Sequence, residues 1–488
     1  MPRIAMLLVL IELVAASALP CPAFGAVTYT SGVASGDVTE TGVILWTRVD
    51  QGAQLAAQVA LDAGFQQLIQ SVPVVAGPET DFTVKTDVGG LQPATRYFYR
   101  FVQGAQDTEA MPAVSATGTF HTAPLPDRPA DVRFAYSGDS EAGFQPFTLL
   151  DAVRQENPDF FAYLGDTIYA DTDSAAGNVT QLPPAETLPV YRAKYQENRQ
   201  DAFLQALLAA TPTYAIWDDH EVLNDFAGEA VDPTLLDHGL QAFLEYMPIR
   251  PDAADPGQLF RRFRWGRAVD LFILDERQYR SAERFCVRDG HLVLIPIVQD
   301  PRCFLTELAA RERTMLGARQ QAWLTRELRT SEATFKVIVN AVPMSALYVL
   351  PYDRWESYVA EREALLQFMR ANLRNVIVLT TDLHGTLILE ASPFLSNDPV
   401  AKEVIVGPIA SSGALAKTGM APPMLRAPRA GVDLPACIHL DTFSYGLVEV
   451  DSQAQPPQLT ITVKGQEGHP LLDPVTQQPC RITIQAED

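Results

Sequence analysis

The sequence has little positive charge and few cysteines. Among its 488 residues, 37 Lys and Arg stand against 59 Asp and Glu, a formal net charge of −22. Proteins that bind nucleic acid neutralise phosphates with Lys and Arg, so this balance argues against a nucleic-acid-binding surface. The five cysteines form no CxxC pair, and no Gly-x-Ser-x-Gly sequence occurs. We therefore expect neither a zinc–thiolate site, nor a CxxC redox motif, nor a serine-hydrolase nucleophile elbow.

The N-terminus also lacks an apolar run long enough to span a bilayer. Residues 4–19 are mostly apolar but contain Glu12, and they fall short of the ~20 residues that a transmembrane helix needs. Arg3 precedes this run, small residues follow it, and there is no twin-arginine pair. The pattern predicts a general secretory signal peptide over residues 1–25 and a secreted or periplasmic protein without a stable membrane anchor. A single membrane anchor is the alternative, and the sequence leaves the oligomeric state open.

Four cysteines remain after the predicted cleavage, and they allow three disulfide pairings. The pairs Cys286–Cys303 and Cys437–Cys480 close the shortest loops. In an oxidising compartment the first of these would contribute ~3 kcal/mol through loop-closure entropy. Buried free thiols are the alternative.

Residues 26–126 have the pattern of an all-β domain. Short strand-like runs such as 43–49 and 97–101 are separated by clusters of Gly, Pro, Asp and Thr, which is typical of a β-sandwich. The stretch 91–97 resembles the tyrosine-corner segment of fibronectin type III domains, and we expect Trp46 to fill the core. The Pro-rich segment 124–129 marks the end of this domain.

From residue 127 to residue 488 the sequence alternates between strand-like and helix-like segments. Helices are expected at about 147–156, 199–210, 313–329 and 356–373, between short apolar runs. This layout predicts an α/β domain with its active residues at strand ends.

Acidic residues directly follow four of the apolar strands. The polar clusters are 137–140, 165–169, 217–221 and 380–385. One such cluster is explained by a helix cap or a turn, but four in order predict a common site. Carboxylates that converge on one spot repel one another unless cations lie among them. The sequence therefore predicts a two-metal site.

Five motifs occur in order along the chain. They are Gly-Val-Ala-Ser-Gly-Asp at 32–37 together with 43–48, Leu-Gly-Asp-Thr-Ile-Tyr at 164–169, Trp-Asp-Asp-His-Glu-Val at 217–222, Leu-Asp-Glu-Arg-Gln-Tyr-Arg at 274–280, and Asp-Leu-His at 382–384. In this order the chain resembles the calcineurin-like metallophosphatase superfamily, and within it the alkaline phosphatase D (PhoD-like) family. The resemblance spans nearly all of the mature chain. It implies a four-layer αββα metallophosphatase sandwich over 127–488, preceded by a fibronectin- or immunoglobulin-like β-sandwich over 26–126.

The resemblance also implies a set of metal ligands. Asp166 is expected to bridge two metal ions, and Tyr169 to bind as a phenolate. Asp219 takes the place of the ligating Asn of the superfamily's Gly-Asn-His motif. The other expected ligands are Asp139, Asn224, Asp382 and His384.

For catalysis the resemblance implies His220 as the residue that faces the phosphate, beside Asp219. Arg277, with Arg280, could clamp the phosphate, and a structural ion-pair role is the alternative for both. Asn340 falls where many members of the superfamily carry a ligating histidine.

The sequence departs from the family pattern in the first motif. The better-known pattern has there a cysteine whose thiolate binds ferric iron, whereas this chain has Gly138 at or near that place, followed by Asp139. The expected ligands are then mostly oxygen atoms, which suit Ca²⁺, Mn²⁺, Mg²⁺ or Fe³⁺. We expect two or more such ions as cofactors.

These features predict a secreted metal-dependent hydrolase of small phosphomonoesters or phosphodiesters, in which a hydroxide that bridges the metals attacks phosphorus. A phosphodiesterase of phospholipase D type is one alternative. A surface-binding protein built on a degenerate phosphatase scaffold is another, and it should have lost several of the expected ligands.

Overall fold

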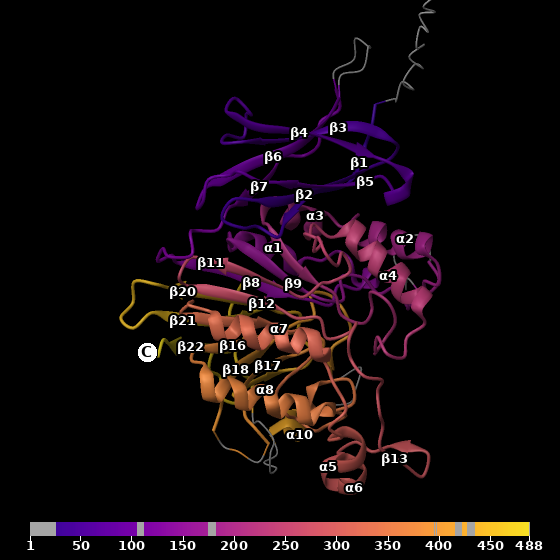
Figure 1. Ribbon diagram of the computed structural model, residues 1–488, viewed down its shortest axis with the longest axis vertical. Helices are drawn as coiled ribbons and strands as arrows, with labels where there is room; N and C mark the ends of the chain where they lie inside the picture. The colour runs from indigo at the N-terminus through magenta and orange to yellow at the C-terminus, as the bar shows by residue number, and fades with distance from the viewer. Residues whose placement is uncertain are drawn as a thin grey trace, which may run out of the picture.

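The computed structural model describes residues 26–104, 112–173, 182–394, 396, 398–414, 422–426 and 435–487. The predicted signal peptide, residues 1–25, lies outside these ranges. Within them, no helix is both long and apolar enough to cross a bilayer. The N-terminal strands lie at one end of the elongated molecule, and the α/β part with its helices forms the rest (Figure 1).

The N-terminal strands form two facing layers, as the sequence predicts for an all-β sandwich. One layer contains β1 (Tyr29–Gly36), β2 (Val43–Val49) and β5 (Thr83–Val88). The other contains β4 (Leu68–Ala76), β3 (Ala53–Ala60), β6 (Arg96–Gln103) and β7 (Gly118–His121), in that order. The Tyr97 hydroxyl accepts a hydrogen bond from the backbone N–H of Gln92 at 2.9 Å, which is a tyrosine-corner arrangement.

The first layer is continuous with a sheet of the α/β part, which the sequence did not indicate. β1 pairs in parallel with β10 (Thr213–Ile216) through Gly36 and Thr213. A side chain at Gly36 would collide with the backbone oxygens of Thr213 and Pro248, so this junction requires glycine. Trp46 is fully buried, but its Nε1 donates to the carbonyl of Glu245 at 2.8 Å, toward the α/β part. A domain boundary at 126 stays a prediction, because the sheet crosses it.

Two mixed sheets form the centre of the α/β part. The nine-stranded sheet has the order β22 (Arg481–Gln485), β21 (Gln458–Lys464), β20 (Tyr445–Asp451), β8 (Val132–Ser137), β9 (Phe160–Leu164), β10, β1, β2 and β5. The seven-stranded sheet has the order β11 (Arg261–Trp265), β12 (Val269–Ile273), β15 (Phe335–Val339), β16 (Val376–Thr380), β18 (Ala401–Ile405), β17 (Thr386–Ala391) and β19 (Cys437–His439).

Helices cover the outer faces of these sheets. They are α1 (Leu149–Gln155), α2 (Leu188–Asn198), α3 (Ala202–Ala210), α4 (Pro233–Tyr246), α7 (Gly317–Thr330) and α8 (Val359–Asn372). The shorter helices are α5 (Pro296–Gln299), α6 (Pro301–Cys303) and α10 (Pro422–Arg426), and of these α5 and α6 stand away from the sheets (Figure 1). Shorter helical turns are η1 (Pro78–Thr80), η2 (Ala142–Phe144), η3 (Phe304–Leu308) and η4 (Trp355–Ser357).

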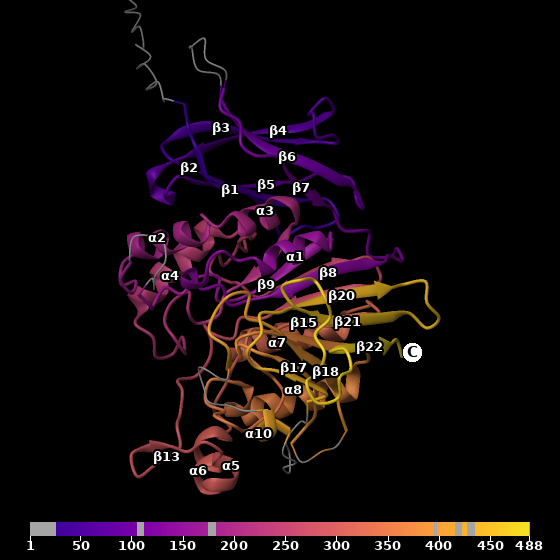
Figure 2. The same cartoon turned by 180° about the vertical axis from the view of Figure 1, so that it is seen from behind.

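The alternation of side chains along β15 shows how the layers stack. Val337 and Val339 join the core between the two sheets, whereas Ile338 packs with Leu324 of α7 and Leu366 of α8. Because the central parallel strands are buried on both faces, they are apolar without interruption, as the sequence showed. Helices α1 and α3 lie on the face of the nine-stranded sheet that is turned away from the seven-stranded sheet (Figure 2). The α/β fold and its four-layer arrangement are thereby confirmed.

The expected helices are present, with starts that differ by a few residues. The helix expected from 199 begins at 202 because the Asp201 side chain caps it, accepting from the N–H groups of Phe203 and Leu204. The structure joins Cys286 to Cys303 and Cys437 to Cys480, so the pairing that closes the shortest loops is confirmed.

Candidate metal centre and active site

The site lies where the carboxyl ends of strands from both sheets meet. β8, β9 and β10 are parallel neighbours, and they end just before Asp139, Asp166 and Asp219. β16 belongs to the other sheet and ends before Asp382. The Thr381 hydroxyl donates to the carbonyl of Leu164 at 2.6 Å, which holds the two strand ends together.

Four residues of these strand ends have a left-handed backbone, which is rare outside glycine. The φ angles are 61° at Asp139, 49° at Asp166, 64° at Asp382 and 55° at His384. Such conformations cost free energy and concentrate at functional sites, where they direct side chains to one point.

The first group of candidate ligands contains Asp139, Asp166 and His384. One ligand atom of each lies within 4.8 Å of the others, and all three side chains are buried. Nδ1 of His384 lies 2.7 Å from the carbonyl oxygen of Ser412, so Nδ1 carries the proton and Nε2 faces the group as a potential metal ligand. The Tyr169 hydroxyl lies 3.2 Å from this Nε2, which places the predicted phenol ligand in the same group.

A second group shares Asp166 with the first. Ligand atoms of Asp166, Asp219 and His220 lie within 4.8 Å of one another, and so do those of Asp218, Asp219 and Asp382. Asp166 thus belongs both to the group with Asp139 and His384 and to the group with Asp219 and His220. A carboxylate that bridges two metal ions, as expected for Asp166 from the sequence, would occupy such a position.

Asp166 also provides a test of whether a cation fits here. Its Oδ2 is fully buried and has no hydrogen-bond partner in the part of the chain that the structure describes. Burial raises the pKa of Asp166 well above its ordinary value, and the charges of Asp219, Asp218 and Asp139 raise it further. Burial and the charge of Asp218 likewise raise the pKa of Asp382. A cation would remove this repulsion and fill the unmet coordination of Oδ2, so the residues fit metal ions.

Asp219 differs from its neighbours because cationic groups lie next to it. Burial disfavours its charged form, but the charges of Arg277 and His220 outweigh burial and lower the pKa of this carboxyl below its ordinary value. Asp219 is therefore ionised more readily than Asp166, Asp218 or Asp382, whose pKa values are raised.

His220 is held by a carboxylate that the sequence reasoning did not single out. Its Nδ1 lies 2.6 Å from Oδ1 of Asp171, and its ring stacks on Tyr169 with 4.2 Å between centroids. Oδ2 of Asp171 accepts from the backbone N–H of Asn224 at 2.8 Å. The sequence did contain a clue to this residue: Asp171 is a further carboxylate two residues after the motif that ends at Tyr169.

Asn224 is exposed, and it meets Asp171 through its backbone N–H, so a role for its side chain as a ligand stays a prediction. The Asn340 side chain is buried, and its Oδ1 accepts from Nε1 of Trp355 at 2.9 Å while its amide nitrogen donates to Thr380 at 3.4 Å. These hydrogen bonds give the Asn340 side chain a structural role, and a role as a metal ligand stays a prediction.

Arg277 is fully buried beneath the carboxylates. It donates to Asp218 at 2.5 Å and to both oxygens of Asp353 at 2.7 and 2.9 Å, and it lies 3.8 Å from Asp219. Arg280 is also buried and pairs with Asp353. These contacts favour the ion-pair alternative for both arginines over a direct clamp on phosphate. Sequence reasoning missed Asp353, which lies on a loop without a strand-end motif.

Gly138 has no room for a side chain. A Cβ atom there would lie 2.5 Å from the carbonyl oxygen of Leu164 and 3.1 Å from Oγ1 of Thr381. This lack of space leaves Asp139, and not a residue at 138, as the candidate ligand of the first motif.

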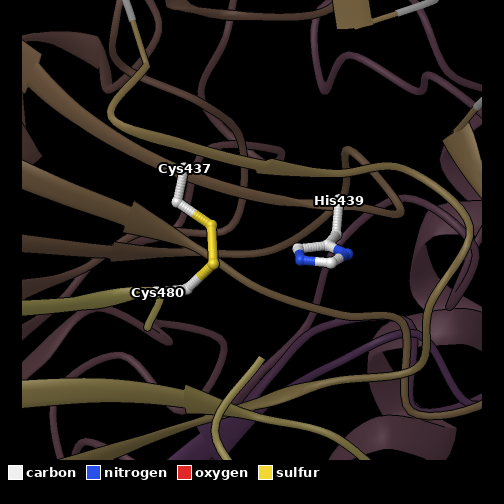
Figure 3. Close-up of side chains that lie close together, drawn as sticks. All are labelled: Cys437, His439 and Cys480. Carbon is white, nitrogen blue, oxygen red and sulfur yellow. A yellow bond between two sulfur atoms is a disulfide. The ribbon is translucent and has the colours of Figure 1, made fainter. Parts of the chain in front are cut away.

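A further group of potential ligands lies elsewhere, at Cys437, His439 and Cys480 (Figure 3). Its two sulfur atoms are joined in a disulfide, so neither can bind a metal as a thiolate. His439 instead places Nε2 2.8 Å from the carbonyl oxygen of Leu472.

Comparison with known proteins agrees with this geometry. The sequence model of the PhoD-like phosphatase family matches residues 134–458, and that of the PhoD-like phosphatase N-terminal domain matches residues 15–124. Alkaline phosphatase D of Bacillus subtilis (strain 168) is 31% identical over 402 residues, which cover 75% of this chain and 66% of that protein. The chain thus spans slightly less than two thirds of that relative's length.

Two solved structures share the fold. One, described as the structure of PhoD, superposes with a TM-score of 0.74 at 24% identity and covers 95% of this chain and 90% of its own. The other is purple acid phosphatase PPD1 from yellow lupin, with a TM-score of 0.59 at 13% identity, covering 94% of this chain and 74% of its own. The resemblance drawn from the motifs is confirmed, and the chain belongs to the PhoD-like phosphatase family.

Proposed function

We propose that this protein is a secreted, metal-dependent phosphohydrolase that cleaves small phosphomonoesters, phosphodiesters or both. The observation that supports it most is the position of Asp166, whose carboxylate belongs both to the group with Asp139 and His384 and to the group with Asp219 and His220. Cations bound in these groups would act as Lewis acids and lower the pKa of a water molecule, which is the chemistry that ester hydrolysis needs.

The ligand groups would fit hard cations. Asp139, Asp166, Asp219 and Asp382 offer carboxylate oxygens, Tyr169 offers a phenol oxygen, and His384 is the principal nitrogen donor. Oxygen-rich sets of this kind favour Ca²⁺, Mn²⁺, Mg²⁺ or Fe³⁺. Two or more ions would be held, with Asp166 between them.

Protonation of the leaving group and positioning of the ligands would fall to residues of the chain itself. Asp171 accepts the Nδ1 proton of His220 and fixes the direction of the ring, so that Nε2 can donate to the oxygen of the leaving group. Stacking on Tyr169 fixes the plane of the ring. Arg277 and Asp353 would position Asp218 and Asp219 from below.

The non-catalytic alternative is disfavoured by the complete ligand set. A degenerate scaffold is expected to lose several of Asp166, Asp219, His220, Asp382 and His384, and all five are present. Relatives named phosphatases support phosphate esters as the substrate class.

Hydrolysis of a nitrophenyl phosphate and of its bis-ester tests the proposal and separates monoesterase from diesterase activity. Asp382→Asn should abolish turnover while the circular dichroism spectrum stays unchanged. An unchanged rate would remove the assignment.

A further inference from the structure

An insertion after β12 projects from the body of the molecule. The chain leaves the seven-stranded sheet at Ile273 and forms β13 (Val287–Arg288), β14 (His291–Leu292), α5 and α6 before it returns to α7. Both views show this segment standing away from the sheets (Figures 1 and 2). We define residues 284–305 as the projection.

The projection is a built structure with a buried side. The turn at Asp289 and Gly290 has positive φ at both residues, 51° and 77°, as a tight two-residue hairpin requires. Cys286 and Val293 are buried with Tyr348 and belong to a small core beneath the hairpin. The disulfide Cys286–Cys303 and a hydrogen bond from the Tyr352 hydroxyl to the carbonyl of Val293 at 2.5 Å fasten it.

Its outer side is apolar. Sixteen large hydrophobic side chains are exposed among the described residues, and six of them lie within this short segment. They are Phe285, Val287, Leu292, Leu294, Val298 and Leu305, between 46% and 64% exposed. Val287 lies opposite Leu292 in the hairpin, so the outer face of the hairpin is continuous. All four strand residues are exposed, whereas Cys286 and Val293, which flank the strands, are buried in the small core. The hairpin thus has its own packed base, and the exposed side chains lie outside it.

Charge distinguishes the projection from the rest of the molecule. It contains three arginines and two aspartates, a formal charge of +1, in a chain whose net charge is −22. Arg302 is exposed, and the Arg288 side chain is 60% exposed and lies 3.9 Å from Asp300 at the edge of the same segment. Apolar side chains interleaved with arginines suit the boundary between acyl chains and phosphate headgroups of a lipid layer. A second copy of this acidic chain fits less well, because the two bodies would repel each other.

We infer that the projection docks the protein onto a phospholipid surface, with its apolar side chains inserted and Arg288 and Arg302 against the headgroup phosphates. β12 runs parallel to β15 and β16, so the projection leaves the sheet at the edge where Asp382 lies. Docking would therefore turn the edge with the metal groups toward the lipid. This inference concerns binding and stands apart from the proposed hydrolysis.

Sedimentation with vesicles tests the inference. The full chain should pellet with vesicles of phosphatidylcholine and phosphatidylglycerol, and V287S/L292S should weaken the partition coefficient by about tenfold or more. L68S/V75S is the matched control, since Leu68 and Val75 are 47% and 69% exposed on β4, away from the projection. All three proteins share one N-terminal segment, so differences report the substitutions. Equal melting temperatures and equal turnover of a soluble ester would show that V287S/L292S folds.

Fluorescence gives a second reading of the same contact. Leu292→Trp should show a blue-shifted emission when vesicles are added, and Val75→Trp should not. Equal vesicle binding by the full chain and V287S/L292S, or no binding by either, would overturn the inference. A dimer that forms without lipid and that V287S/L292S dissociates in sedimentation velocity would also overturn it, by assigning the face to a second copy.

Discussion

Oδ1 of Asp171 lies 2.6 Å from Nδ1 of His220, and Oδ2 of the same carboxylate binds the backbone N–H of Asn224 at 2.8 Å. The imidazole is thereby fixed at one nitrogen, while its ring lies on Tyr169. Asp171 thus fixes His220 from the segment after β9, and Tyr169 of the same segment connects the ring to the candidate ligands.

Replacing Asp171 by Asn should slow turnover by about 10- to 100-fold, because the imidazole loses the charged acceptor that orients it and stabilises its protonated form. A complete loss of general acid catalysis costs roughly 10²–10⁴-fold. The slowing should grow as the leaving group becomes more basic, which a series of aryl phosphates measures. A uniform loss across the series, or a loss of bound metal, would assign Asp171 a merely structural role.

Replacing Arg277 by Met should reduce the free energy of unfolding by about 3–5 kcal/mol, because the buried Asp218 and the partly buried Asp353 would lose their cation. Urea denaturation of the two proteins measures this. Arg128→Met is the control, since that side chain is 70% exposed. A variant with wild-type stability and a raised KM would instead support the direct phosphate clamp.

Replacing Gly138 by Ala should destabilise the protein by about 1–3 kcal/mol, because the added methyl group overlaps the carbonyl of Leu164. Gly89→Ala provides the comparison, as no atom lies within 4 Å of a Cβ built there. A neutral effect of Gly138→Ala on the melting temperature would contradict the packing described at the first motif.

Without metal, the stability of the protein should depend on pH in a defined direction. Burial raises the pKa of Asp166 and Asp382 above their ordinary values, so both carboxyls bind protons more tightly in the folded chain than in the unfolded one. Their contribution is present below the unfolded pKa of about 3.9 and is lost as pH rises toward the folded values. Thermal unfolding of chelated and reloaded protein at pH 5 and pH 8 should show a larger gain from metal at pH 8. An equal gain at both pH values would contradict this assignment.

The strand ends were predictable because each required only local information. An apolar run followed by a Gly-Asp or Asp-x-His segment indicates where a buried parallel strand stops, and Asp139, Asp166, Asp219 and Asp382 were placed in this way. Asp353 was not, because it approaches Arg277 across 76 residues from a loop with no pattern of its own.

Local sequence patterns also could not predict that the N-terminal strands β1, β2 and β5 continue the sheet of the α/β part. The parallel pairing of Gly36 with Thr213 joins segments that are far apart in the chain, and hydrophobic alternation does not specify which strand a given strand pairs with. Likewise, Trp46 has the composition of a core residue, but only the fold shows that its indole contacts Glu245.

The central claim is that Asp166 lies between bound metal ions that the reaction requires. Elemental analysis of the purified protein and of Asp166→Asn, combined with turnover of a nitrophenyl phosphate, tests it most directly, with Asp127→Asn as the exposed-carboxylate control. We expect two or more metal equivalents in the wild-type protein and in Asp127→Asn. In Asp166→Asn we expect at least one equivalent fewer and loss of turnover. A metal-free protein that hydrolyses the ester, or an Asp166→Asn variant with full metal content and full activity, would contradict the account.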